Sequence, residues 1–170
     1  MPAFASLDWE RFDVFATIVG RGVAAVDPVS ANRCEDWLRR HGYRVVALDF
    51  SQGIGRVVAQ LGELLDWRRR FGYELMPESR HLMALHDGFD FGIAESGGVA
   101  LVLHGFGRAQ QEDEAWCRGL LGIVSEHSLR QLALGKRLLA VVVVTGEDDP
   151  VLDWPGRERA AAPRYRRVFR

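Results

Sequence analysis

The segment from Phe71 to Asp90 concentrates the residue types that could recognise another molecule. It mixes aromatic, acidic and imidazole side chains in a predicted loop and the short helix that follows it. Aromatic rings supply buried contact area at interfaces, and carboxylates attract a basic partner and speed its association. The alternative interpretation is a solvated loop that covers the core. The residues that we predict to bind a partner are Phe71, Tyr73, Glu78, His81, His86, Asp87 and Asp90.

Three histidines raise the alternative of a metal site. His81, His86 and His104 would converge with Asp87 if the helix that begins after Ser79 packed beside the end of the strand before His104. The spacing argues against this, because two histidines five residues apart do not share a helical face as an i, i+4 pair does. We therefore predict no metal and no other cofactor, and we keep a small histidine-dependent metal enzyme as the least favoured hypothesis.

Other patterns that would indicate catalysis are incomplete. Ser125 and His127 lie two positions apart on a predicted helix, so they point to different faces. Gly53-Ile-Gly55 follows a strand and precedes a helix, as a nucleotide-binding loop does. Position 58 is valine, however, where the dinucleotide fingerprint has its third glycine, and no Gly-Lys-Ser/Thr is present. We predict that the protein is not an enzyme.

Composition places the chain among ordinary globular proteins. Of its 170 residues 48% are hydrophobic and 26% charged, and the formal net charge is −1. A charge this close to zero gives no overall field for nucleic acid or an anionic membrane, so we predict a protein partner instead. No apolar run reaches the ~18 residues of a membrane span. Cys34 and Cys117 are predicted to be core residues with reduced thiols, which favours a cytoplasmic location.

The pattern of apolar residues predicts an α/β fold. Helical spacing indicates helices between the strands, and the resulting order β-α-β-α-α-β-α-β predicts a small, mostly parallel sheet of about four strands packed by helices. Before it, residues 1–21 form a lead-in that we read as helical or irregular, with a strand as the alternative. Residues 22–146 form the domain, and residues 147–170 form a polar, Arg-rich tail. The expected strands are 22–26, 43–50, 99–104 and 137–144.

Helix ends are predicted from turn and capping residues. Ser30 is the expected N-cap of a helix over 31–40, and a second helix covers 54–67. A short helix follows Ser79. A long amphipathic helix covers 113–135, with a possible interruption at Gly122.

Two features together resemble the barstar family of small inhibitors of secreted ribonucleases. One is the order of elements from about Gly22 to Thr145. The other is His81-Leu-Met-Ala-Leu-His-Asp87, which is similar to the family's Asn-Leu-Asp-Ala-Leu-x-Asp. The resemblance implies a barstar-like fold and an inhibitor or immunity protein that blocks a ribonuclease or other toxin, with Asp87 occupying the phosphate site of a basic nuclease. The positions that match the motif are Leu82, Ala84, Leu85 and Asp87.

The chain departs from this family at the inhibitory motif. Glu78-Ser-Arg80 stands where the family has Tyr-Tyr-Gly, and Met83 replaces the first aspartate. Family inhibitors are also clearly acidic, whereas this chain is nearly neutral. These departures favour the alternative function, an interaction or regulatory protein of barstar-like fold that inhibits no nuclease.

Overall fold

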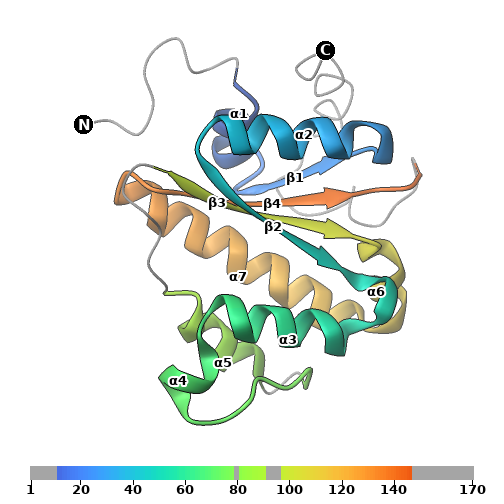
Figure 1. Ribbon diagram of the computed structural model, residues 1–170, viewed down its shortest axis with the longest axis vertical. Helices are drawn as coiled ribbons and strands as arrows, with labels where there is room; N and C mark the ends of the chain where they lie inside the picture. Colours follow the sequence, from blue (N-terminus) through green and yellow to red (C-terminus); the bar gives the residue numbers. More distant parts are fainter. Residues whose placement is uncertain (1–10, 79–80, 91–96, 147–170) are drawn as a thin grey trace.

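Four parallel strands form the centre of the structure, a computed structural model that describes residues 11–78, 81–90 and 97–146 (Figure 1). The strands stand in the order β1-β4-β3-β2, and every neighbouring pair is parallel. The small parallel sheet predicted from the sequence is therefore confirmed. The strands are β1 (Val23–Val26), β2 (Tyr43–Asp49), β3 (Gly98–His104) and β4 (Arg137–Val143).

Helices cover both faces of the sheet. The chain crosses the whole sheet from β1 to β2 and then returns strand by strand through β3 to β4. Because parallel crossovers are right-handed, reversing direction moves the connecting helices to the opposite face. Figure 1 shows α1 and α2 on one face and α3, α5 and α7 on the other. The helices are α1 (Phe12–Ile18), α2 (Pro28–Arg40), the 3₁₀ turn η2 (Phe50–Gln52), α3 (Ile54–Leu64), α4 (Trp67–Phe71), α5 (His81–Gly88), α6 (Phe106–Glu112) and α7 (Glu114–Ala133).

Alternating residues of the central strands build two hydrophobic cores. On β3, Leu101 and Leu103 pack with the helices α3 to α7, whereas Ala100 and Val102 pack with α1 and α2. All four side chains are fully buried. This explains why β3 and β4 read as continuous apolar runs, since a strand buried on both faces has no polar side to alternate with.

The helices differ from the sequence prediction in several places. The predicted helix over 54–67 ends at Leu64, and a separate helix, α4, begins at Trp67. Ser30 is not the N-cap of α2: the Asp27 carboxylate accepts from the Ser30 amide at 3.0 Å, and Pro28 takes the first helical position, where its missing N–H costs no bond. The helix α6 was not predicted, and it begins after Gly105, whose φ of 67° suits glycine. Finally, α7 runs through Gly122 without interruption.

The helix α1 joins the core, as the helical interpretation of its sequence predicts. Phe12 and Ala16 are buried against the face that α2 covers. The packed structure therefore begins before residue 22, although the predicted domain limits at 22 and 146 stay predictions. The predicted tail, 147–170, lies outside the described residues.

Both cysteines are free and buried, as predicted. Burial raises the pKa of the Cys34 thiol and of the Cys117 thiol to about 12, so neither is a reactive thiolate near neutral pH. Among the described helices, none combines the length and apolar character needed to cross a membrane.

Candidate functional site

The helix α5 carries three of the seven predicted site residues, His81, His86 and Asp87, and two glycines let it pack closely. A Cβ atom on Gly88 would lie 2.3 Å from Cζ3 of Trp67, which is buried at the start of α4. A Cβ atom on Gly119 of α7 would lie 2.7 Å from Cδ1 of Leu82. The helix is therefore seated between α4 and α7, and its position is set by side chains that enter the space above a glycine.

Replacing Gly88 with alanine is expected to destabilise the protein by about 1–3 kcal/mol, because the new methyl group overlaps a rigid buried indole. Urea unfolding measures this change. The matched control is Gly122→Ala, a helical glycine whose Cβ would meet no atom within 4 Å. There the better helix propensity of alanine should stabilise by about 0.5–1 kcal/mol. Equal effects of the two variants would contradict the close packing of α5 on Trp67.

Arg70 holds the C-terminal end of α5. Its guanidinium donates to the backbone carbonyls of Gly88 at 2.9 Å and Asp90 at 3.3 Å, and it lies over the ring of Phe71. Arg68 and Arg69 of the same run are exposed and form ion pairs with acidic neighbours. The sequence alone does not predict the role of Arg70, because a local pattern does not show that its side chain reaches a carbonyl eighteen residues away.

The predicted site residues divide into supporting and outward-facing side chains. Phe71 is half-buried against Trp67, with ring centroids 4.3 Å apart, and the ring nitrogen Nδ1 of His81 accepts from the Met76 amide at 3.1 Å. His86 is half-buried and lies 3.0 Å from the Glu126 carboxylate of α7. The exposed members are Tyr73, Glu78, Asp87 and Asp90.

Exposed apolar side chains lie among these acids. Tyr73, Met76 and Met83 are 44%, 45% and 77% exposed, and they account for three of the seven large exposed hydrophobic residues in the described part of the chain. The other four are spread over α1, α2 and the region that ends α7. Sequence reasoning missed Met76 and Met83, although methionine is enriched at protein interfaces. We call the exposed set Tyr73, Met76, Glu78, Met83, Asp87 and Asp90 the α4–α5 surface.

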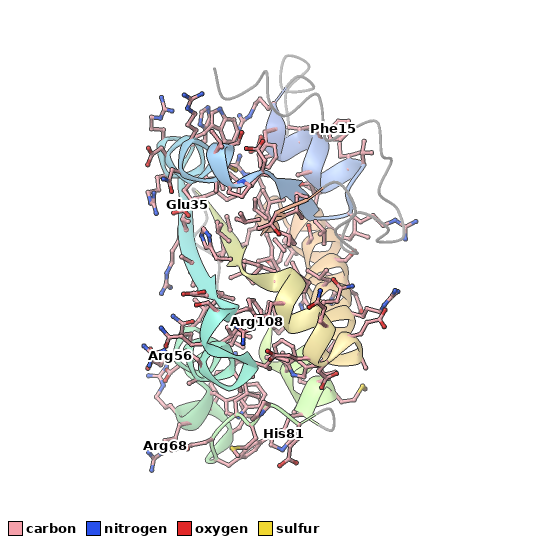
Figure 2. All side chains as sticks on the ribbon, turned by 90° about the vertical axis from the view of Figure 1, so that its right-hand side faces the viewer. Phe15, Glu35, Arg56, Arg68, His81 and Arg108 are labelled. Carbon is pink, nitrogen blue, oxygen red and sulfur yellow. The ribbon has the colours of Figure 1, made fainter. Side chains whose placement is uncertain are left out.

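Figure 1 shows the segment from α4 to α5, which carries this surface, at one end of the molecule, and Figure 2 gives a second view of it. Arg68 and His81 lie together at that end, whereas Glu35 of α2 lies far from them. This matters for the histidines, because His104 at the end of β3 contacts Glu35, with 3.2 Å between Nε2 and Oε1. Glu35 also pairs with Arg39 at 2.7 Å.

His81, His86 and His104 therefore do not converge, and the hypothesis of a metal site built from them is wrong. His81 contacts the segment between α4 and α5, and His86 contacts α7. His104 contacts α2, which covers the opposite face of the sheet. Within residues 11–78, 81–90 and 97–146, no group of three or more histidine, cysteine or acidic side chains has the geometry to hold a metal ion.

Open α/β sheets usually bind ligands at the carboxyl ends of their strands, and here the polar side chains that end β2 and β3 make local contacts. Asp49 ends β2, and its carboxylate accepts from the Ser51 amide at 2.9 Å. This bond lowers the pKa of Asp49, and the neighbouring His104 acts in the same direction. The 3.2 Å contact between His104 Nε2 and Glu35 Oε1 ties β3 to α2 at the same edge. Asp49 and His104 thus have their polar groups engaged within the protein, and we interpret both as structural residues.

His127 is the buried polar residue beside the candidate site. Its side chain is 0% exposed, and its ring centroid lies 4.8 Å from that of His86 and 5.8 Å from that of Phe89. Burial lowers the pKa of His127, and the charge of a protonated His86 would lower it further. The sequence contains a signal for the burial of His127. It lies three residues after Val124 and four after Ile123, which places it on the apolar face of α7.

Comparison with known proteins adds no relative. No family model matches the chain, and neither the curated proteins nor the solved structures contain a match. The resemblance to the barstar family therefore stays a prediction.

Proposed function

We propose that this protein is a protein-binding module that engages its partner through the α4–α5 surface. The observation that carries the proposal is the grouping of Tyr73, Met76 and Met83 with exposed carboxylates at one end of the molecule. Aromatic and methionine side chains give contact area that is desolvated on binding, and surrounding charges orient the partner. This combination suits recognition better than catalysis.

The surface is held firmly by the scaffold beneath it. Arg70 binds the end of α5, Trp67 packs on Gly88, and His86 pairs with Glu126. A surface that is already ordered loses less conformational entropy when a partner binds. The same contacts fix the direction in which Met83 and Asp87 project.

The specific form that the family resemblance implies is an inhibitor or immunity protein. In this form Asp87 enters the active site of a basic nuclease and replaces a substrate phosphate. Its side chain is 80% exposed, and its carboxylate lies 3.8 Å from the His86 ring, which is a long contact. The carboxylate can therefore reach a partner without breaking a strong internal bond.

A second form, interaction without nuclease inhibition, is favoured by the mixed charge around the surface. Arg130 of α7 lies 3.9 Å from the Asp90 carboxylate, and the exposed Arg68 lies 3.7 Å from Glu74, the residue that follows Tyr73. These cations offset part of the acidic character that would attract a basic nuclease. A partner with a mixed or weakly charged face fits such a surface.

Replacing Asp87 with alanine should weaken partner binding by about 2–4 kcal/mol, which is roughly a thirtyfold to thousandfold increase in Kd. The expected loss is this large because a central charged contact would be removed. Isothermal titration calorimetry with the partner captured from native cell extract measures it. A loss below about 0.5 kcal/mol would remove Asp87 from the site. Glu114→Ala, an exposed acidic control at the start of α7, should leave Kd unchanged.

The identity and activity of the captured partner separate the two forms. A basic nuclease whose RNA cleavage is blocked by the wild-type protein, but not by Asp87→Ala, supports the inhibitor. A partner without nuclease activity that still requires the α4–α5 surface supports the second form.

A further inference from the structure

His127 occupies an unusual position under α5. It is fully buried, and neither ring nitrogen makes a hydrogen bond of good geometry among the residues that the structure describes, although the His86 backbone lies close enough to favour the protonated ring. Buried polar side chains are nearly always hydrogen-bonded, so a buried imidazole without such a bond calls for an explanation. Its ring packs against those of His86 and Phe89, which come from α5 and its end.

The charged groups around His127 come from α5 and from α7 itself. The β-sheet beneath α7 contributes apolar side chains, including Leu138, Ala140 and Val142. Arg70 of α4 approaches through the backbone carbonyls at the end of α5. The titratable and charged side chains that act on His127 or contact His86 are Asp87, Asp90, Glu126 and Arg130, together with His86 itself. His81, Glu114 and Arg118, the other histidine and charged side chains on the two helices, contact other groups.

These neighbours favour the neutral form of His127. Burial is the largest contribution to its lowered pKa, followed by the positive charge that His86 carries when protonated; Arg130 acts in the same direction. The His86 backbone and Asp90 oppose the shift. The carboxylates of Glu126 and Asp87 contact the His86 ring, so they stabilise a proton on His86 and not one on His127. A proton on His127 is therefore poorly compensated while α5 covers it.

We propose that α5 is held on α7 as a pH-sensitive latch, in which neutral His127 keeps α5 docked and protonated His127 releases it. The α4–α5 surface would then form at neutral pH and be lost in mild acid. This inference names a regulation of the proposed binding surface and rests on the proposed function in that respect. The latch itself needs no partner and is tested without one.

The direction of the effect follows from proton linkage. When α5 detaches, water reaches His127 and its pKa returns toward the ordinary value near 6.5. The detached state then binds more protons than the docked state, so docking is favoured above about pH 6.5 and weakens as the pH falls below it. Carboxyl groups generally titrate near pH 4 and do not account for a change in this range.

Amide hydrogen exchange of the full chain at pH 7.5 and pH 5.5 tests the latch. After correction for the intrinsic exchange rate, protection of the α5 amides should fall about tenfold at pH 5.5. At this pH, one unit below the pKa of exposed His127, the binding of one proton favours the open state about tenfold. Protection of α2, on the opposite face, should not change. Unchanged protection of α5, or an equal loss in α2, would overturn the proposal.

Two variants assign the effect to His127. In His127→Leu the α5 protection should be the same at both pH values, whereas in His86→Gln the loss at pH 5.5 should persist. Persistence in His127→Leu, or disappearance in His86→Gln, would overturn the assignment. If His127→Leu does not fold, the ring ¹⁵N shifts of wild-type His127 give the same answer. They should report a neutral ring while α5 is docked, and a protonated ring in the docked state would contradict the latch. None of these outcomes bears on whether the α4–α5 surface binds a protein.

Discussion

Replacing Asp13 with alanine is expected to destabilise the protein by about 3–5 kcal/mol, the cost of leaving buried partners of a charge unpaired. Asp13 is 0% exposed, and its carboxylate accepts from Arg137 at 2.7 Å, from Tyr43 Oη at 2.8 Å and from Arg11 at 2.8 Å. These residues begin β4, begin β2 and precede α1. One carboxylate therefore joins α1 to two strands.

Tyr43 contributes to this network as a donor. Burial raises the pKa of its hydroxyl above the ordinary value, and the Asp13 carboxylate raises it further, so the hydroxyl keeps its proton at neutral pH. The Arg137 guanidinium lies 4.7 Å from the centre of the Tyr43 ring. Removing Asp13 would leave Arg137, whose side chain is only 16% exposed, without its carboxylate.

The control for Asp13 is Asp36→Ala. Asp36 is also a helical aspartate paired with an arginine, Arg39, but it is 69% exposed. Its loss should change stability by less than about 0.5 kcal/mol, since exposed ion pairs contribute little. Urea unfolding with equal m values measures both variants. A loss below about 1 kcal/mol for Asp13→Ala would contradict the role of the network.

Replacing Trp67 with alanine should cost about 3–5 kcal/mol, as large aromatic truncations in a core do. Trp67 is 1% exposed and contacts the ring of Phe71 at 4.3 Å and that of Tyr73 at 5.9 Å, and it fills the space above Gly88. The variant would leave a cavity directly beneath the α4–α5 surface. Thermal and urea unfolding measure the loss.

Tyr73→Ala is the matched control for Trp67. It removes an aromatic ring from the same cluster, but that ring is 44% exposed. Its truncation should cost less than about 1 kcal/mol, because partly hydrated area is lost and no closed cavity forms. Similar losses for the two variants would show that Trp67 is not the support of this region.

Local sequence patterns predicted β3 and β4 most clearly because these strands are buried on both faces. Val99 to Leu103 and Leu138 to Val144 are apolar throughout, and such runs are recognisable without any neighbour. The same patterns do not determine which strands pair, since β1 lies beside β4, the strand farthest from it in the chain.

The contacts missed by sequence reasoning join residues far apart in the chain. Asp13 bonds Arg137 across 124 positions, and Glu35 bonds His104 across 69. No periodicity links such pairs. The candidate site shows the same limit: the exposure of Asp87 agrees with a binding role, but the supporting roles of His81 and His86 follow from the packing of α5.

Photo-crosslinking from position 83 is the measurement that tests the protein-binding surface most directly. A benzophenone amino acid is placed at Met83 on α5 or at Val29 on α2, which are 77% and 81% exposed and thus comparably accessible. The proteins are irradiated in native cell extract, and cross-linked products are identified by mass spectrometry. We predict one discrete protein adduct from position 83 and none from position 29. No adduct from position 83, or the same adduct from both positions, would contradict binding through the α4–α5 surface.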